Sequence, residues 1–157
     1  MEFKIEEATA ADWPLIEERS EETVWQDLVP YRQEELDRKG LGRRVRELLE
    51  RLRGERLNQA FVARDEEGRF AGYIWLAESS DYLAGQQEAH VIDIYVEEGY
   101  RRRGLGRTFL QLAERWAKER GYRFIALSVA AHNRVARTLY KKAGYREEWV
   151  GMGKRVG

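Results

Sequence analysis

The run from Ala89 to Val96, Ala-His-Val-Ile-Asp-Ile-Tyr-Val, constrains the fold of this chain more than any other segment. It is rich in residues that favour strands, and its apolar side chains fall on odd and even positions alike. A strand with apolar residues on both faces is covered on both sides. We therefore expect residues 89–96 to form a central strand of a sheet flanked by helices.

The rest of the sequence alternates between strand and helix patterns. Strands are predicted at residues 3–7, 59–64, 70–78, 124–129 and 145–156, with a hairpin turn at 65–68 and a loop at 79–87. Helices are predicted from residue 12 to 25, over 41–52, from 105 to 120 and from 133 to 143, with Pro30 separating the first two. Without a linker or an internal repeat, residues 1–157 are expected to form one α/β domain with a mixed sheet.

Charge and composition narrow the function classes. The 28 Lys and Arg residues balance the 28 Asp and Glu residues, so no overall field attracts nucleic acid or an anionic membrane. No apolar run reaches the roughly 18 residues of a membrane span, and the N-terminus lacks a signal-peptide core. We therefore expect a soluble, cytoplasmic protein. The absence of cysteine excludes thiolate nucleophiles, and two histidines without a His-x-x-x-His pair predict no metal site.

An arginine- and glycine-rich turn joins the strand at 89–96 to the following helix. Gly104 and Gly106 lack a Cβ atom where the chain turns, so backbone N–H groups can approach an anion closely. The helix N-terminus beginning at Leu105 adds partial positive charge. Further positive charge comes from Arg102, Arg103 and Arg107. The turn is suited to a pyrophosphate or a similar anion, although such a turn also occurs without a ligand. Neither a Walker A loop nor a dinucleotide-binding glycine pattern is present.

Two motifs together resemble the GNAT superfamily of N-acetyltransferases. The family pattern Arg/Gln-x-x-Gly-x-Gly/Ala is met by Arg101, Gly104 and Gly106, directly after the strand. About 27 residues further on, the run from Asn133 to Tyr145 resembles the second signature of the family. The resemblance implies a mixed, mostly antiparallel sheet flanked by helices, and acetyl transfer from acetyl-CoA to an amine.

The resemblance also implies roles for individual residues. The family splays the strand at 89–96 from the next one, so backbone groups of Ile94 and Val96 are expected to bind the pantetheine arm. Asn133 is expected to contact the same arm, and Tyr140 is expected to protonate the departing thiolate. The full set of expected cofactor-binding residues is Ile94, Tyr95, Val96, Arg101, Arg102, Arg103, Gly104, Leu105, Gly106, Arg107, Asn133 and Tyr140.

Two of these residues have a structural alternative. Asn133 stands where a helix N-cap is expected, and it can cap the helix and contact a ligand at once. Tyr140 lies on the apolar stripe of the predicted helix, so it can also be a core tyrosine. As an acid it is well suited, because a phenol with a pKa of about 10 is protonated at neutral pH.

Direct attack of the acceptor amine on the thioester is the expected mechanism, and it requires a base. No cysteine and no Gly-x-Ser-x-Gly motif is present to form an acyl-enzyme. His90 is the first candidate base because its intrinsic pKa suits the task. Regular alternation places His90 on one face with Ile92 and Ile94, and a bulge would change this. Asp93 is a second candidate, with Glu88 and Glu78 as further alternatives; a partly buried structural role for His90 also remains open.

The acceptor is expected to be a cationic amine. Carboxylate and aromatic side chains occur in the segments expected to line its pocket, although a solvated helix face is the alternative. These side chains are Glu21, Glu22, Trp25, Asp27, Tyr31, Glu34 and Tyr82. The short tail leaves room for a second subunit to complete the pocket, which makes a homodimer an expectation to test. Rival functions are an acyl-CoA sensor without turnover and a nucleic-acid-binding module.

Overall fold

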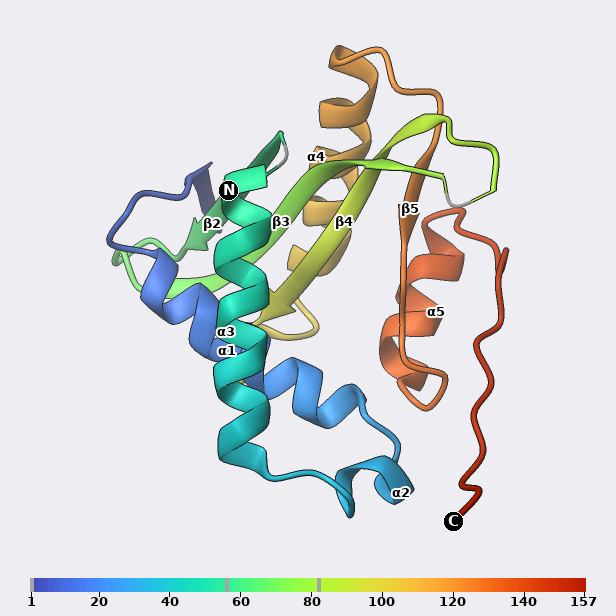
Figure 1. Cartoon of the computed structure of the whole chain (residues 1–157). Helices are drawn as coiled ribbons and strands as arrows, with labels where there is room; N and C mark the ends of the chain where they lie inside the picture. Colours follow the sequence, from blue (N-terminus) through green and yellow to red (C-terminus); the bar gives the residue numbers. More distant parts are fainter. Residues whose placement is uncertain (1, 56, 82) are drawn as a thin grey trace.

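A five-stranded sheet with the strand order β1-β2-β3-β4-β5 organises the chain (Figure 1). This computed structural model describes residues 2–55, 57–81 and 83–157. The strands are β1 (Lys4–Glu7), β2 (Asn58–Arg64), β3 (Phe70–Ser80), β4 (Gln87–Val96) and β5 (Ile125–Leu127). Neighbouring strands from β1 to β4 are antiparallel, whereas β4 and β5 are parallel. The expected mixed, mostly antiparallel sheet is therefore confirmed.

Helices lie on both faces of this sheet (Figure 1). They are α1 (Trp13–Asp27), α2 (Pro30–Gln33), α3 (Arg38–Glu55), α4 (Leu105–Glu119) and α5 (Arg134–Lys142), with a 3₁₀ turn at Glu98–Tyr100. Each predicted helix is present. Pro30 begins the short helix α2 rather than only interrupting the chain, because a proline at the first helical position loses no needed N–H bond.

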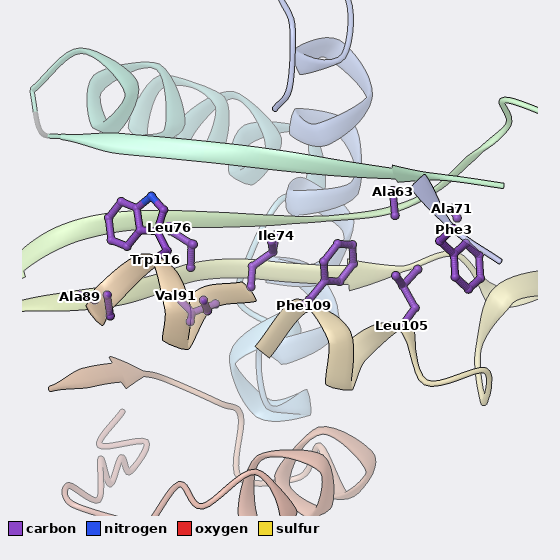
Figure 2. Close-up of a cluster of buried hydrophobic side chains, with 12 residues drawn as sticks. Phe3, Ala63, Ala71, Ile74, Leu76, Ala89, Val91, Leu105, Phe109 and Trp116 are labelled. Carbon is purple, nitrogen blue, oxygen red and sulfur yellow. The ribbon is translucent and has the colours of Figure 1, made fainter. Parts of the chain in front are cut away.

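The predicted stripe of α4 packs on one face of the sheet. Leu105, Phe109 and Trp116 are each at most 3% exposed and point from α4 toward the sheet, where Phe109 lies next to Ile74 and Leu105 lies near Phe3 (Figure 2). Burying each of these large side chains stabilises the fold by roughly 1.5–3 kcal/mol. This packing fixes the start of α4, and therefore the glycine turn before it, against the end of β4.

A second core covers the opposite face. Ile16 of α1 and Leu49 of α3 pack with Tyr73 and Trp75 of β3. Helices α1 and α3 therefore cover the face of the sheet toward which these side chains of β3 point. Ser20, Tyr73 and Asp93 also meet on this face of the sheet.

Strand β4 is an interior strand of the sheet, as predicted. It is covered on both faces, with Val91 in the first core and Ile92 packed against the second. In the strand order β3 is the middle strand, and β4 lies inside the sheet between β3 and the short β5, which pairs with only the first half of β4. The apolar residues on both faces of β4 indicate that helices cover both of its faces. They do not indicate its exact place in the strand order.

The C-terminal strand predicted at 145–156 is wrong. Residues 145–157 form an extended segment without strand pairing, and Trp149, Val150 and Met152 are exposed. Tertiary contacts hold this tail instead: Arg155 Nη2 donates to the Tyr31 carbonyl at 2.7 Å. Two glycines in the tail, at 151 and 153, weaken strand formation, and the three-residue β5 offers little edge to pair with. The loop predicted at 79–87 is also shorter, since β3 extends to Ser80 and β4 starts at Gln87.

Candidate active site

Strands β4 and β5 separate at the centre of the molecule (Figure 1). Their pairing covers Ala89–Ile125, His90–Ala126 and Val91–Leu127, and β4 then continues to Val96 beyond the last β5 pair. The splay implied by the family resemblance is therefore present. The Glu97 N–H bonds the Ala71 carbonyl on the β3 side, so the backbone groups of Ile94 and Val96 alternate toward the open side.

The glycine turn opens the N-terminus of α4 at the end of this splayed strand. Gly104 is the N-cap of α4 and has a left-handed backbone with φ +81°. Its carbonyl accepts hydrogen bonds from the N–H and the Oγ1 of Thr108, both at 3.0 Å. The N–H groups of residues 105–107 precede that first helical bond and point out of the helix end. The residues present thus suit a phosphate group, which such N–H groups bind.

The two motif glycines are required for different reasons. A Cβ atom on Gly104 would meet nothing within 4 Å, so glycine is needed there for its backbone conformation. A Cβ atom on Gly106 would lie 2.9 Å from Cδ2 of Leu139 on α5. Gly106 therefore leaves room for the Leu139 side chain of α5, a role that the sequence did not reveal.

Two of the loop arginines are engaged by the protein. Arg101 Nε donates to the Val96 carbonyl at 3.0 Å, which ties the loop to the end of β4. Arg103 pairs with Glu2 at 2.8 Å, and its guanidinium lies 5.5 Å from the centre of the Tyr100 ring. Arg102 adopts a positive φ of 66°, which bends the chain into the turn. These contacts shape the loop, and its backbone N–H groups remain the main candidates for binding phosphate.

Helix α5 brings Asn133 and Tyr140 to the same region. The Asn133 side chain accepts a hydrogen bond from the Ala136 N–H at 3.1 Å, which confirms its capping role. Tyr140 is the buried residue of α5, at 8% exposure. Burial raises the pKa of the Tyr140 phenol, and the negative charges of Asp93 and Asp27 raise it further. Tyr140 is therefore protonated over a wide pH range and lies within electrostatic reach of two carboxylates.

A β-bulge decides which face of the sheet receives Asp93. Trp75 pairs with Asp93 and Leu76 pairs with Val91, so Ile92 is the extra residue on β4. Regular alternation would place Asp93 with Ala89 and Val91 in the core under α4. The bulge instead turns Asp93 toward α1, where Ser20 Oγ donates to its Oδ2 atom at 2.5 Å.

The same bulge corrects the expected grouping of His90. His90 and Ile92 line one small cavity of about 180 Å³ together with Leu52, Ala77 and Ser79. Ile94, which regular alternation places with them, packs on the opposite face against the α4 core. His90 therefore lies on the α3 side of the sheet, in the half of β4 that still pairs with β5.

The other two candidate bases occupy different surroundings. Glu78 accepts a hydrogen bond from the Tyr122 hydroxyl. Burial raises the pKa of Glu88, and the nearby charges of Asp81 and Glu148 contribute to the increase. Neither carboxylate is among the charges that raise the pKa of Tyr140, whereas Asp93 is.

Several residues expected to bind the acceptor make contacts within the protein. Glu21 lies 3.6 Å from Arg46, Glu34 pairs with Arg155, and Arg38 stacks on Trp25. Tyr82 lies outside the described residues. Asp27 at the end of α1 is the carboxylate whose charge reaches Tyr140; burial raises its pKa, as does the charge of Asp93. Next to it, the Gln26 carbonyl lies 2.9 Å from His132 Nε2 and joins α1 to the loop before α5.

The hydroxyl groups of Ser20 and Tyr73 also belong to this region and were not predicted as site residues. Ser20 is 2% exposed and Tyr73 is 0% exposed, and both hydroxyls bind Asp93. The signal was present, because Ser20 stands four residues after the buried Ile16 on the inner face of α1. A hydroxyl at such a position needs a buried partner.

No three His, Asp or Glu side chains in the described part of the chain gather as metal ligands. No helix among those residues is long and apolar enough to cross a membrane.

Comparison with known proteins agrees with this architecture. Residues 13–145 match the model of the acetyltransferase (GNAT) family, so the chain belongs to that family. It is 33% identical over 90 residues to the uncharacterized N-acetyltransferase YycN of Bacillus subtilis, covering 57% of this chain and 56% of YycN. For the uncharacterized N-acetyltransferase YdgE of the same organism the identity is 35% over 92 residues, covering 59% of this chain and 57% of YdgE. The matches thus span little more than half the length of these curated relatives.

Solved structures share the whole fold. A Pyrococcus furiosus protein named as a candidate acetyl transferase superposes with a TM-score of 0.84 and 27% identity, covering 99% of this chain and all of that one. A predicted acetyltransferase from Clostridium acetobutylicum, solved with acetyl-CoA, has a TM-score of 0.66 at 19% identity and covers 96% of both chains. The latter likeness establishes the common fold alone.

Proposed function

We propose that this chain is an N-acetyltransferase that moves an acetyl group from acetyl-CoA to a primary amine of a small molecule, a protein N-terminus or a lysine. The observation that carries the proposal is the splay between β4 and β5, which ends at the glycine turn that opens the N-terminus of α4. An acid that stays protonated and a nearby carboxylate are the two groups that direct transfer to an amine requires.

The residues of the splay and the glycine turn suit coenzyme A. The N–H groups at the start of α4 would hold the pyrophosphate, and the backbone of Ile94 and Val96 would bind the pantetheine arm. Asn133 already uses its side-chain oxygen to cap α5, which leaves its amide nitrogen for a ligand. When bound, acetyl-CoA supplies an activated thioester.

Tyr140 and Asp93 divide the proton transfers between them. Asp93 accepts a proton from the ammonium form of the acceptor, whose nitrogen then bonds the acetyl carbon in a ternary complex. As the carbon–sulfur bond breaks, the Tyr140 phenol donates its proton to the leaving thiolate, and the second proton of the attacking nitrogen then restores the phenol. Asp93 is preferred to His90 as the base because its charge acts on Tyr140, whereas His90 lies beside the α3 cavity.

The acceptor side carries negative charge. Asp27 and Asp93 both act on Tyr140, so an acceptor bound there meets two carboxylates. Such an environment favours a cationic amine over a neutral one. A second subunit of a homodimer would complete the pocket at the exposed tail, where Trp149 is 68% exposed.

The test measures thiol release and cofactor binding on the same protein. Purified protein is incubated with acetyl-CoA and a panel of polyamines, aminoglycosides, peptides with free N-termini and lysine peptides, and free thiol is recorded. Acetyl-CoA affinity is measured by calorimetry. Amine-dependent thiol release supports the proposal. Tight acetyl-CoA binding without release on any amine would instead establish the alternative, a non-catalytic acyl-CoA sensor.

A further inference from the structure

Three oxygen atoms from three elements form a buried cluster at Asp93. Ser20 Oγ donates to Asp93 Oδ2 at 2.5 Å, and the Tyr73 hydroxyl donates to the same oxygen. The two hydroxyl oxygens lie 2.9 Å apart. Helix α1 and strands β3 and β4 therefore converge on one carboxylate oxygen.

The number of protons in this cluster favours one charge state of Asp93. An ionised carboxylate only accepts hydrogen bonds, whereas each hydroxyl has one proton to donate. Both hydroxyl protons can point to Oδ2, and bonds to a charged acceptor are stronger than neutral ones. Burial raises the pKa of the Asp93 carboxyl, and the hydrogen bonds from Ser20, Tyr73 and the backbone of Ile94 offset part of that increase.

We infer that Ser20 and Tyr73 are positioning residues, which keep the buried Asp93 carboxylate ionised and turn its other oxygen, Oδ1, toward the acceptor amine. The inference rests on the proposed function, in which Asp93 is the base. Neither hydroxyl touches the substrate in this arrangement, because each is directed at Oδ2 and acts through Asp93.

The surroundings of the cluster explain why hydroxyl groups suit this task. The groups facing it are acidic or phenolic: Asp27 from α1, Tyr95 from β4 and Tyr140 from α5 interact with Asp93 or with Tyr73. Arg19 of α1 stacks on Tyr95 and forms its ion pair with Glu97. A cation paired with Asp93 would lower its pKa strongly and weaken it as a base. Two neutral donors stabilise the charge less and leave the carboxylate basic.

The experiment measures the pKa of Asp93 directly in the free protein and compares it with the pH dependence of the reaction. The ¹³C resonance of the Asp93 carboxyl, assigned with Asp93→Asn, is titrated in wild type, Ser20→Ala and Tyr73→Phe. Loss of a hydrogen bond to a charged group is expected to raise this pKa by about one to two pH units. The acidic limb of kcat with a fixed amine should move to higher pH by the same amount.

Tyr122→Phe is the matched control. It also removes a tyrosine hydroxyl bonded to a carboxylate, in this case Glu78. We expect the carboxyl pKa of Asp93 and the acidic limb to be unchanged in this variant. If the acidic limb of the kcat–pH profile shifts in Tyr122→Phe but not in Tyr73→Phe, the inference is overturned and the base is Glu78.

The remaining outcomes separate the inference from the proposed function. If Asp93→Asn keeps full activity, the acetyltransferase function stands, but Asp93 is not the base and the positioning inference fails with that assignment. If Asp93→Asn is inactive while Ser20→Ala and Tyr73→Phe leave its pKa and the acidic limb in place, the base assignment stands and the positioning roles are wrong. Because Tyr73→Phe keeps the buried ring and Ser20→Ala removes one atom, near-ultraviolet circular dichroism should confirm that both variants fold.

Discussion

Gly106 in the first turn of α4 packs directly against Leu139 of α5, with only 2.9 Å between the place of a Cβ atom and Leu139 Cδ2. The two sequence motifs, one on the glycine turn and one on α5, are therefore in physical contact. This contact places the helix that carries Tyr140 against the helix whose N-terminus is suited to phosphate. A Cβ atom at Gly106 would require the Leu139 side chain to shift away from the first turn of α4.

Gly104 provides a test of the phosphate site with a matched control. Gly104→Val and Gly121→Val place the same β-branched residue at φ +81° and φ +78°, at opposite ends of α4 and in open space. Both should lose similar stability in urea, since a left-handed conformation costs roughly 1–2 kcal/mol. Only Gly104→Val should weaken acetyl-CoA binding, by about tenfold or more, because phosphate contacts to the turn are lost. If calorimetry gives the same acetyl-CoA affinity for Gly104→Val and Gly121→Val, the pyrophosphate assignment is refuted.

Tyr140→Phe tests the acid. We expect kcat to fall at least about 100-fold while acetyl-CoA affinity is kept, because only the proton donor is lost. Tyr145→Phe serves as the comparison: its partly buried ring lies with its centroid 6.0 Å from that of Tyr140, and burial raises the pKa of Tyr145 to about 12. That variant should keep most of its activity. If both variants behave alike in steady-state assays, the loss reflects packing and not proton donation.

The raised pKa of Tyr140 predicts an unusually wide alkaline range. An acid must be protonated to act, and a pKa above its ordinary value of about 10 keeps the phenol protonated at higher pH. The kcat should therefore show no alkaline decline up to about pH 10. Asp27→Asn removes one of the charges that raise this pKa, so any alkaline limb should move to lower pH. Rates corrected for spontaneous thioester hydrolysis check both statements, and a decline beginning near pH 8 would contradict them.

Asp27 should contribute to the binding of a cationic acceptor. Asp27→Asn is expected to raise the KM for a polyamine about two- to fivefold, the range of a partly exposed ion pair, with a smaller effect at high salt. Glu66→Gln removes the same charge from the exposed β2–β3 turn and should leave KM unchanged. A similar change in both variants would indicate a general charge effect and no local contact.

Much of the candidate site could be predicted because its motifs are local. The strand, the glycine turn and the amphipathic α4 follow one another between Gln87 and Glu119, and the α4 stripe and the Asn133 cap were placed correctly. The choice between His90 and Asp93 could not be made in this way. It depends on the bulge at Ile92, which arises from the pairing of β4 with β3 and is invisible in the β4 sequence itself.

The helices, most of the strands and the glycine turn could be predicted from local sequence. They follow from the spacing of apolar side chains and from the backbone conformations that glycine can adopt. The tertiary structure alone decided that β3 is the middle strand, that the tail forms no strand, and that Ser20 and Tyr73 meet at Asp93. These features depend on contacts between distant segments of the chain. The contacts of Ser20 with Tyr73 and Asp93, for example, join residues more than fifty positions apart. Their geometry is fixed only when the strands pair and the helices pack on both faces of the sheet.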